Sequence, residues 1–254
     1  MKKAILVASF GSTHIDTLEN CVYPMERAIA GAFPEHKFYR AFLSNIVRKR
    51  LAENKNMIVP DVTHAMEEIV KEGMEEVLVQ PTLMIPGEEY DRCLAQLEPF
   101  SDKIKIKVGK PLFSDEKDMD EIIAILEKTY PMAEDEVLLV MGHGTEHSAN
   151  SIYETLAEKM RSHKSIRLCT VEGTPTFEDG VAELKSMNVK RATLIPLMLV
   201  AGDHAKNDMA GDGEDSLASM IQAEGIETTC VINGLGSMEE VQKLFRIRAN
   251  EAEK

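Results

Sequence analysis

The segments ILVASFGSTH (residues 5–14) and LLVMGHGTEH (residues 138–147) follow one pattern, in which a short apolar run ends in a glycine-containing turn. A shift of 133 residues, which carries residue 5 to residue 138, also aligns Gly11 with Gly144. A continuous apolar run without in–out alternation is typical of a strand buried on both faces of a parallel sheet. The two segments therefore predict two copies of one unit, each beginning with such a strand.

A second self-alignment covers the region that follows. Residues 60–87 align without a gap on residues 175–202, a shift of 115 that pairs prolines and glycines as well as apolar positions. The shifts of 133 and 115 differ by 18, so the first copy carries about 18 extra residues between Phe10 and Met57. We expect this extra piece to include residues 45–55, whose basic run 48–50 is either a solvated helix face or a clamp for an anionic ligand.

Short apolar runs alternate along the whole chain with amphipathic segments of helical length. The predicted strands are residues 4–8, 37–43, 77–80, 104–108, 137–141, 167–171, 192–195 and 228–232. The predicted helices include residues 62–71, 118–128, 152–161, 178–187 and 238–248. Repeated strand–helix units predict an α/β fold made of two similar parallel-sheet domains, residues 1–115 and 116–254. Residues 118–128 could pack on either domain.

Charge and composition exclude several functional classes. The chain has 254 residues, with 43 acidic and 29 basic side chains and a formal net charge of −14. Binding to nucleic acid or anionic lipid needs a basic face, so we predict neither as a partner. No apolar run approaches the roughly 20 residues of a membrane span. The apolar run after Lys3 predicts a first strand rather than an export signal, and the four scattered cysteines indicate reduced thiols in the cytoplasm.

Three side chains of the second copy are predicted to share one sheet edge, because ligands bind at the carboxyl ends of parallel strands. His143 ends the first strand, Glu172 ends the second, and His204 follows the third. The corresponding positions of the first copy hold Phe10, Met57 and Glu89. Structural constraints act on both copies alike, so this asymmetry favours a functional role. Two imidazoles and a carboxylate suit a divalent transition metal or proton transfer near neutral pH; three unrelated loop residues are the alternative.

Two other motifs suggest competing interpretations. Residues 143–147 match the H-x-x-E-H string of some zinc peptidases, whose histidines must lie on one continuous helix. Gly142 and Gly144 flank the first histidine directly after a strand, which favours a strand-to-loop turn instead. His147 aligns with His14, which indicates a shared structural role at a helix start. The glycine turn at residues 11–13 matches neither of the two common phosphate-binding loop motifs.

Longer motifs resemble a known family. MGHGTEHSAN (residues 141–150), VEGTP (171–175) and PLMLVAGDHAKNDMAGD (196–212) are similar to the anaerobic, class II sirohydrochlorin cobalt chelatases of CbiK type, which are related in fold to ferrochelatase. ILVASFGST (5–13) and QPTLMIPGEEYD (80–91) resemble the first-domain motifs of that family. The resemblance extends over essentially the whole chain.

The resemblance implies a tetrapyrrole cleft between two similar domains, with the metal site on the second. The implied reaction is ATP-independent insertion of Co²⁺ into sirohydrochlorin, a macrocycle with eight carboxylates, on the anaerobic route to cobalamin. His143 and His204 carry over as metal-binding, proton-accepting catalytic residues, and Glu172 as the third metal ligand. The substrate-binding residues are expected on two loops of the first domain, residues 9–12 and 86–90. They are Ser9, Phe10, Gly11, Ser12, Pro86, Gly87, Glu88, Glu89 and Tyr90. No cofactor is implied beyond the substrate metal, for which Fe²⁺ or Ni²⁺ are alternatives in vitro.

Two rival functions stay open at the level of sequence. One is a sirohydrochlorin ferrochelatase for sirohaem, since histidine and glutamate ligands follow the general affinity order of divalent metals rather than selecting cobalt. The other is a non-catalytic, two-lobed protein that binds haem or metal, although a storage site usually closes its coordination shell. Whether the chain forms a homo-oligomer, and which histidine takes the pyrrole proton, also stay open.

Overall fold

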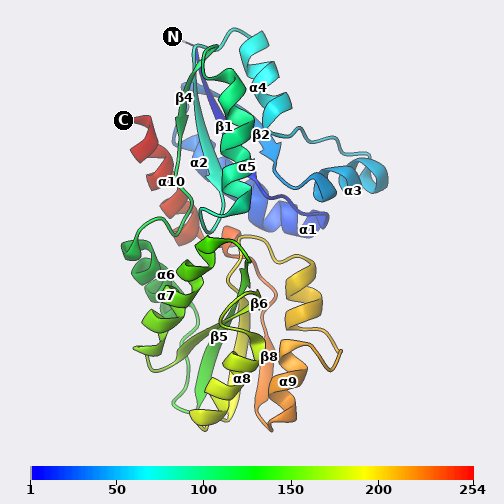
Figure 1. Cartoon of the computed structure of the whole chain (residues 1–254), viewed down its shortest axis with the longest axis vertical. Coiled ribbons are helices and arrows are strands. Elements are labelled where there is room, and N and C mark those ends of the chain that lie inside the picture. The colour runs from blue at the N-terminus through cyan, green and yellow to red at the C-terminus, as the bar shows by residue number, and fades with distance from the viewer. Residues whose placement is uncertain (1) are drawn as a thin grey trace. The chain divides into compact units, whose positions relative to one another are not determined.

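The computed structural model describes residues 2–254 as two compact units (Figure 1). Unit 1 comprises Met1–Ser114 together with Gly236–Lys254, and unit 2 comprises Asp115–Leu235. Each unit holds one four-stranded, all-parallel sheet with helices packed on it. No helix among the described residues is both long enough and apolar enough to cross a membrane.

Unit 1 has the strand order β2-β1-β3-β4. Its strands are β1 (Lys3–Ser9), β2 (His36–Phe42), β3 (Glu76–Thr82) and β4 (Lys105–Val108). Its α-helices are α1 (Ile15–Thr17), α2 (Tyr23–Gly31), α3 (Asn45–Lys55), α4 (Val62–Lys71), α5 (Glu88–Leu97) and α10 (Glu239–Glu253), with short turns η1 (Leu18–Val22) and η2 (Glu98–Phe100). Helices α4 and α5 pack on one face of the sheet, and α2 and α10 pack together against β1 and β3.

Unit 2 repeats this arrangement in the order β6-β5-β7-β8. Its strands are β5 (Glu136–Gly144), β6 (Ile166–Glu172), β7 (Arg191–Pro196) and β8 (Glu227–Cys230). Its helices are α6 (Glu116–Thr129), α7 (Ser151–Arg161), α8 (Phe177–Ser186) and α9 (Leu217–Ala223), with short turns η3 (Ser148–Asn150) and η4 (Ala205–Met209); the turn η5 (Leu235–Ser237) lies where the chain returns to unit 1.

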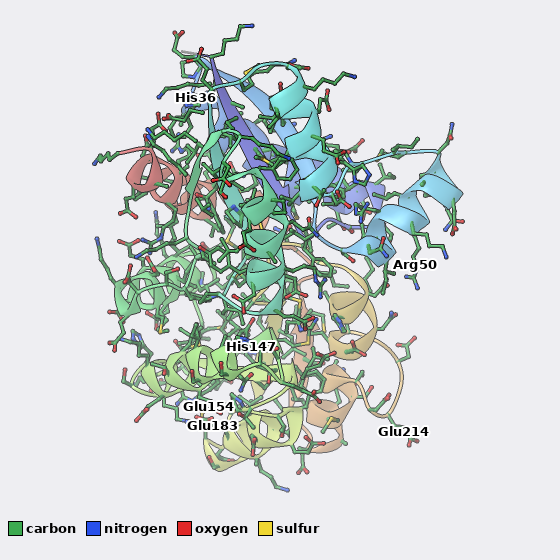
Figure 2. All side chains as sticks on the ribbon, turned by 45° about the horizontal axis from the view of Figure 1, so that its top comes forward. His36, Arg50, His147, Glu154, Glu183 and Glu214 are labelled. Carbon is green, nitrogen blue, oxygen red and sulfur yellow. The ribbon has the colours of Figure 1, made fainter. Side chains whose placement is uncertain are left out.

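The strand registers confirm the internal duplication. Lys3 lies opposite Glu76 in unit 1, and Glu136 lies opposite Arg191 in unit 2. Residues 3 and 136 differ by 133, and residues 76 and 191 by 115, so the structure reproduces both shifts. The extra residues of the first copy form α3, which follows β2, whereas in unit 2 only four residues separate β6 from α8. Arg50 of the basic run is exposed on α3 (Figure 2), and Arg48 pairs with Asp61 at 3.3 Å.

The central strands are fully buried because helices cover both of their faces. Ile5, Leu6 and Val7 of β1 have no exposed surface, and the same holds for Leu139 and Val140 of β5. Full burial of a side chain of this size contributes about 1.5–3 kcal/mol relative to exposure. This is the physical reason that these strands appear in the sequence as continuous apolar runs.

The C-terminal helix α10 belongs to unit 1, although it follows the last strand of unit 2. Its buried stripe of Val241, Phe245 and Ala249 packs against α2 and β3. The predicted second domain, residues 116–254, therefore differs from unit 2 at its C-terminal end. An amphipathic helix shows that it covers a sheet, but its pattern does not say which sheet.

An ion-pair network holds the last turn of α10 on unit 1. Glu76, 2% exposed, lies 2.9 Å from Lys3 Nζ and 2.6 Å from Lys105 Nζ. Glu253 at the end of α10 lies 2.5 Å from the same Lys3 Nζ and 3.2 Å from Lys107 Nζ. The hydrogen bond from Lys105, supported by Lys3 and Lys107, lowers the pKa of Glu76 to about 2 against the opposing effect of burial.

We expect Glu76→Gln to destabilise the protein by about 2–3 kcal/mol at pH 7, because it leaves the lysines around a buried position without their counter-charge. The folded-state pKa of about 2 lies below the unfolded value of 4.5, so this stabilisation is present above pH 4.5 and is lost as the pH falls toward 2. Urea unfolding of the wild type and the variant between pH 7 and pH 2 measures the difference.

The neighbouring variant Glu75→Gln, at an exposed position, serves as the control and should change stability by less than about 0.5 kcal/mol at any pH. A Glu76→Gln variant whose deficit relative to the wild type stays constant as the pH falls would contradict this account.

Candidate metal site

Three side chains of unit 2 converge at the carboxyl ends of neighbouring strands. His143 is the penultimate residue of β5, Glu172 is the last residue of β6, and His204 directly precedes η4. One ligand atom from each lies within 4.8 Å of the other two, and the His143 and His204 rings meet edge to face with centroids 4.8 Å apart. The structure thus brings together the three residues that the strand-end argument predicted.

Two glycines allow the strands that carry His143 and Glu172 to approach closely. Gly144 has φ +75°, and a Cβ atom built on it would lie 1.3 Å from the carbonyl oxygen of Glu172. Gly173, directly after Glu172, has φ +98°. A positive φ is unfavourable for residues other than glycine, so the backbone conformation requires glycine at both positions. At Gly144 the lack of space for a Cβ atom requires it as well. Gly144 and Gly173 are therefore part of the site's construction.

Four residues separate helix α8 from the end of β6, and the start of the helix holds the Glu172 loop in place. The Oγ1 of Thr176 accepts a hydrogen bond from the Asp179 amide, and the Asp179 carboxylate accepts one from the Thr176 amide. This reciprocal pair is a capping box, which satisfies donors that a helix start leaves free. It fixes where the chain turns from the Glu172 loop into the helix.

Asn150 joins the loops that follow β5 and β6. Its Oδ1 accepts a hydrogen bond from the Thr145 amide at 3.2 Å, and its Nδ2 donates to the Thr174 carbonyl at 3.0 Å. These bonds connect residues 5 and 24 positions away in the chain, so sequence reasoning missed this role of Asn150. In the sequence, its place at the end of the motif of residues 141–150 was the signal that could have pointed to this role.

Each histidine uses its Nδ1 atom in a hydrogen bond. His143 Nδ1 lies 2.9 Å from the Gly144 carbonyl oxygen, and His204 Nδ1 lies 2.5 Å from Asp208 Oδ2. A carbonyl oxygen or a carboxylate only accepts, so each Nδ1 donates in these hydrogen bonds and each Nε2 lone pair is available to a metal or a proton. His143 Nδ1 also lies 3.9 Å from Glu172 Oε2. Asp208 was not predicted from the sequence.

The donor set and its exposure suit an ion that is bound and then released. The side chains of His143, Glu172 and His204 are 44%, 56% and 39% exposed, so solvent and a large ligand can reach them. Two imidazoles and one carboxylate suit Co²⁺, Fe²⁺, Ni²⁺ and Zn²⁺. Three protein ligands leave coordination positions open for exchange, which distinguishes this site from a closed structural one.

A second convergent group occurs among residues 2–254, formed by His36, Glu76 and Glu253 in unit 1 (His36 is labelled in Figure 2). Here the Lys3 ammonium already lies 2.9 Å from one carboxylate and 2.5 Å from the other. Burial lowers the pKa of His36, which keeps the imidazole neutral. A protein cation thus takes the place that a metal would need, and we assign this group to the ion-pair network of α10.

The first-copy counterparts of the three ligands form no such group among the described residues. Phe10 is 39% exposed at the end of β1, and the Met57 sulfur accepts a hydrogen bond from the Tyr23 hydroxyl. Glu89 lies in the first turn of α5. The difference between the copies that was read from sequence is therefore also a difference in their local chemistry.

The predicted substrate-binding residues fall into two groups in the structure. Ser9 and Ser12 are buried, and the Ser9 hydroxyl accepts a hydrogen bond from the Thr82 hydroxyl at 2.7 Å. The segment 86–90, predicted as a loop, enters α5 at Glu88, and Gly87 is its N-cap residue. Three acidic residues in its first turn favour the helix by interacting with the helix dipole, a signal that the loop prediction overlooked. Contact of these residues with a substrate stays a prediction.

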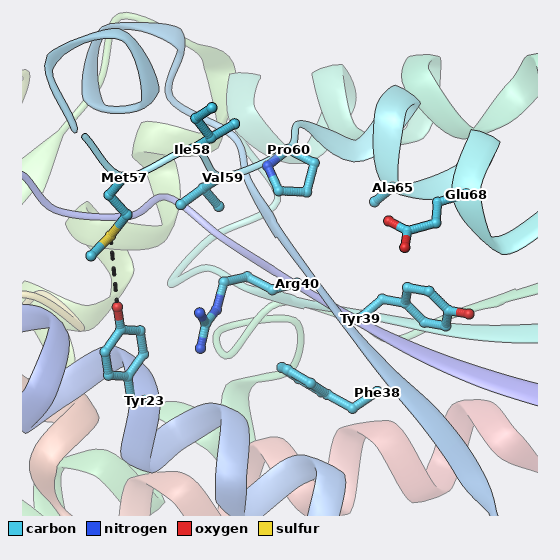
Figure 3. Close-up of a pocket in the computed structure, with 10 residues that line it drawn as sticks. All are labelled: Tyr23, Phe38, Tyr39, Arg40, Met57, Ile58, Val59, Pro60, Ala65 and Glu68. Carbon is cyan, nitrogen blue, oxygen red and sulfur yellow. Dashed lines mark hydrogen bonds between the residues drawn. The ribbon is translucent and has the colours of Figure 1, made fainter. Parts of the chain in front are cut away.

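Unit 1 contains a cavity of about 350 Å³ beside the edge strand β2 (Figure 3). Tyr23, Phe38 and Arg40 line one side of it, and Met57 and Ile58 line another. Arg40 pairs with both carboxylate oxygens of the buried Glu26 and lies over the Tyr23 ring. The arginine charge is thus compensated within the protein, and the cavity does not resemble an anion site.

The two parallel α/β units resemble solved structures of chelatases in fold. SirB from Bacillus subtilis, solved with Fe³⁺, superimposes with a TM-score of 0.68 at 17% identity, covering 99% of this chain and 96% of that one. CbiX, described as the terminal enzyme of sirohaem biosynthesis in denitrifying bacteria, gives a TM-score of 0.58 at 16% identity, covering 98% and 99%. At these identities the likeness concerns the fold alone.

Sequence comparison identifies the family. The sequence model described as cobalt chelatase (CbiK) matches residues 3–254, and the chain belongs to this family. The sirohydrochlorin cobaltochelatase of Salmonella typhimurium is 31% identical over 255 residues, covering 99% of this chain and 97% of the relative. The sirohydrochlorin cobaltochelatase CbiKC of Nitratidesulfovibrio vulgaris is 33% identical over 244 residues, covering 94% and 86%.

Proposed function

We propose that this protein is a sirohydrochlorin cobaltochelatase, which inserts Co²⁺ into sirohydrochlorin without ATP on the anaerobic route to cobalamin. The observation that carries the proposal is the convergence of His143, Glu172 and His204 within 4.8 Å in a chain of the cobalt chelatase family. The names of the two curated relatives support sirohydrochlorin and cobalt as the substrates. We place the reaction in the cytoplasm, where the thiols of the four cysteines would stay reduced.

In this proposal the metal is a substrate and not a resident cofactor. His143, Glu172 and His204 replace part of the hydration shell of the incoming ion and fix its position. The remaining coordination positions keep exchangeable water, which the ring nitrogens displace one after another. Three ligands of intermediate softness hold the ion firmly enough to orient it and still allow its transfer, since imidazole binds Co²⁺ well without closing its coordination shell.

The same histidines can also receive the protons that leave the ring. Insertion of a divalent ion releases two pyrrole protons, and transfer of the ion frees the Nε2 lone pairs of His143 and His204. Each imidazole then accepts one proton, so two bases become available at the moment when two protons need acceptors. Imidazole is suited to this role because its usual pKa lies close to neutral pH.

The net charge of −14 is consistent with the metal as one substrate. A negative field raises the local concentration of a divalent cation and speeds its encounter with the site. The same negative field disfavours the binding of a macrocycle with eight carboxylates, so recognition of sirohydrochlorin must rest on local hydrogen-bond donors and positive charges. The candidates are the basic run 48–50 on α3, of which Lys49 and Arg50 are exposed, together with Arg92, Lys206 or backbone donors.

Turnover tests the proposal directly. Protein at substoichiometric concentration is mixed anaerobically with sirohydrochlorin and Co²⁺, and metallation is followed by its absorbance change. We expect several turnovers per protein molecule, and a lower kcat/KM when Fe²⁺ replaces Co²⁺. An amplitude limited to one equivalent per protein would instead indicate a binding protein. A preference for Fe²⁺ would indicate a sirohydrochlorin ferrochelatase.

A further inference from the structure

Asp208 lies four residues after His204, on the single turn η4. In a helical turn, residues four positions apart lie on the same face, so the carboxylate can reach the imidazole. The distance from His204 Nδ1 to Asp208 Oδ2 is 2.5 Å, so the two side chains are in direct hydrogen-bond contact. Asp208 is not one of the three residues whose ligand atoms converge, so it is not itself placed as a ligand of the metal.

We propose that Asp208 is a positioning residue for metal insertion, an inference that rests on the proposed function. Its carboxylate accepts the Nδ1 proton of His204 and thereby fixes both the tautomer and the direction of the ring. With Nδ1 protonated, the Nε2 lone pair of His204 is the one available to a metal held together with His143 and Glu172. Residues that orient a metal-binding histidine in this way commonly change metal affinity or activity 10- to 100-fold when they are removed.

His204 needs this support more than His143 does. The Nδ1 atom of His143 is bonded to the carbonyl oxygen of Gly144, the next residue of the same strand, and the strand backbone holds that oxygen in place. His204 directly precedes a five-residue turn, and its side chain is 39% exposed. Without Asp208 the exposed ring could rotate or offer either nitrogen, so the geometry of the ligand set would become heterogeneous.

Binding of Co²⁺ alone, without sirohydrochlorin, separates this role from general effects on the reaction. We expect Asp208→Ala to weaken Co²⁺ binding by about 10- to 100-fold and to alter the visible ligand-field bands of the bound ion, because the set of ligands around it changes. Asp208→Asn retains an oxygen that accepts from Nδ1, so it should lie closer to the wild type than the alanine variant does. Asp212→Ala, at an exposed position on the same segment, should bind Co²⁺ like the wild type.

A double-mutant cycle with His204 makes the inference specific. Once His204→Ala has removed the ring, further replacement of Asp208 by alanine should have no additional effect on Co²⁺ affinity, because the residue acts only through that ring. An undiminished effect of Asp208→Ala in the His204→Ala background would overturn the inference. Wild-type affinity and an unchanged Co²⁺ spectrum in the Asp208→Ala single variant would overturn it as well.

The experiment distinguishes failure of this inference from failure of the proposed function. Suppose that the wild type inserts Co²⁺ and that His204→Ala weakens Co²⁺ binding, while Asp208→Ala changes neither insertion nor binding. The chelatase function then stands and the positioning role is wrong. If the wild type shows no insertion and His204→Ala leaves Co²⁺ binding unchanged, the proposed function fails, and this inference fails with it.

Discussion

His143→Ala should lower the rate of Co²⁺ insertion by about 10²- to 10⁴-fold, the range found when a positioned proton acceptor is removed. The variant loses a metal ligand and a base in one step, because the same imidazole serves both roles. The side chain is 44% exposed, so its loss should change the free energy of unfolding by less than about 1 kcal/mol. The absorbance assay measures the rate, and urea unfolding measures the stability.

A histidine of unit 2 that lies outside the metal site, His163, provides the matched control. His163 is 38% exposed and its Nδ1 lies 3.0 Å from a carboxylate oxygen of Glu127, so it resembles His143 in exposure and in having an acidic neighbour. His163→Ala should retain the wild-type rate of insertion. A wild-type rate in the His143→Ala variant would refute the assignment of the metal site.

Gly144→Ala should destabilise unit 2 by at least about 4 kcal/mol and abolish metal insertion. The added Cβ would lie 1.3 Å from the Glu172 carbonyl oxygen, so β5 and β6 must separate at the point where they carry His143 and Glu172. The φ of +75° adds about 1–2 kcal/mol of backbone strain for alanine. Urea unfolding, together with the Co²⁺ titration used for Asp208, measures both consequences.

Gly202→Ala is the control for this prediction. Gly202 lies two residues before His204, and a Cβ atom there would have no neighbour within 4 Å. Its replacement should change stability by less than about 1 kcal/mol and leave Co²⁺ binding intact. Equal stability of the two glycine variants would show that the contact between β5 and β6 does not constrain the site.

Much of the fold was predictable because the central strands are buried on both faces. Such strands need apolar residues at successive positions, so β1 and β5 appear in the sequence as runs that also reveal the repeat. The placement of α10 was not predictable from its periodicity. Glu253, near its C-terminal end, forms ion pairs with Lys3 and Lys107 of unit 1. The position of unit 2 that corresponds to Lys3 holds Glu136, which could not form such a pair.

The three convergent side chains were predictable for a related reason. Parallel strands bring their carboxyl ends to one edge, so residues at the ends of β5, β6 and β7 meet there whatever their separation in sequence. Asp208 and Asn150 were missed because they act through hydrogen bonds that the strand pattern does not contain. The spacing of four residues between His204 and Asp208 is a usable signal only when a helical turn is known to connect them.

The return of α10 to unit 1 has a consequence for the order in which the protein folds during synthesis. Domains commonly fold in the order in which they leave the ribosome, starting from the N-terminus. Here unit 2 is continuous from Asp115 to Leu235, whereas unit 1 lacks one covering helix until Glu239–Glu253 has been made. Unit 1, most of which is translated first, can therefore complete its core only after unit 2 has been made. Until then, the sheet surface that receives Val241 and Phe245 stays open to solvent and to chaperones.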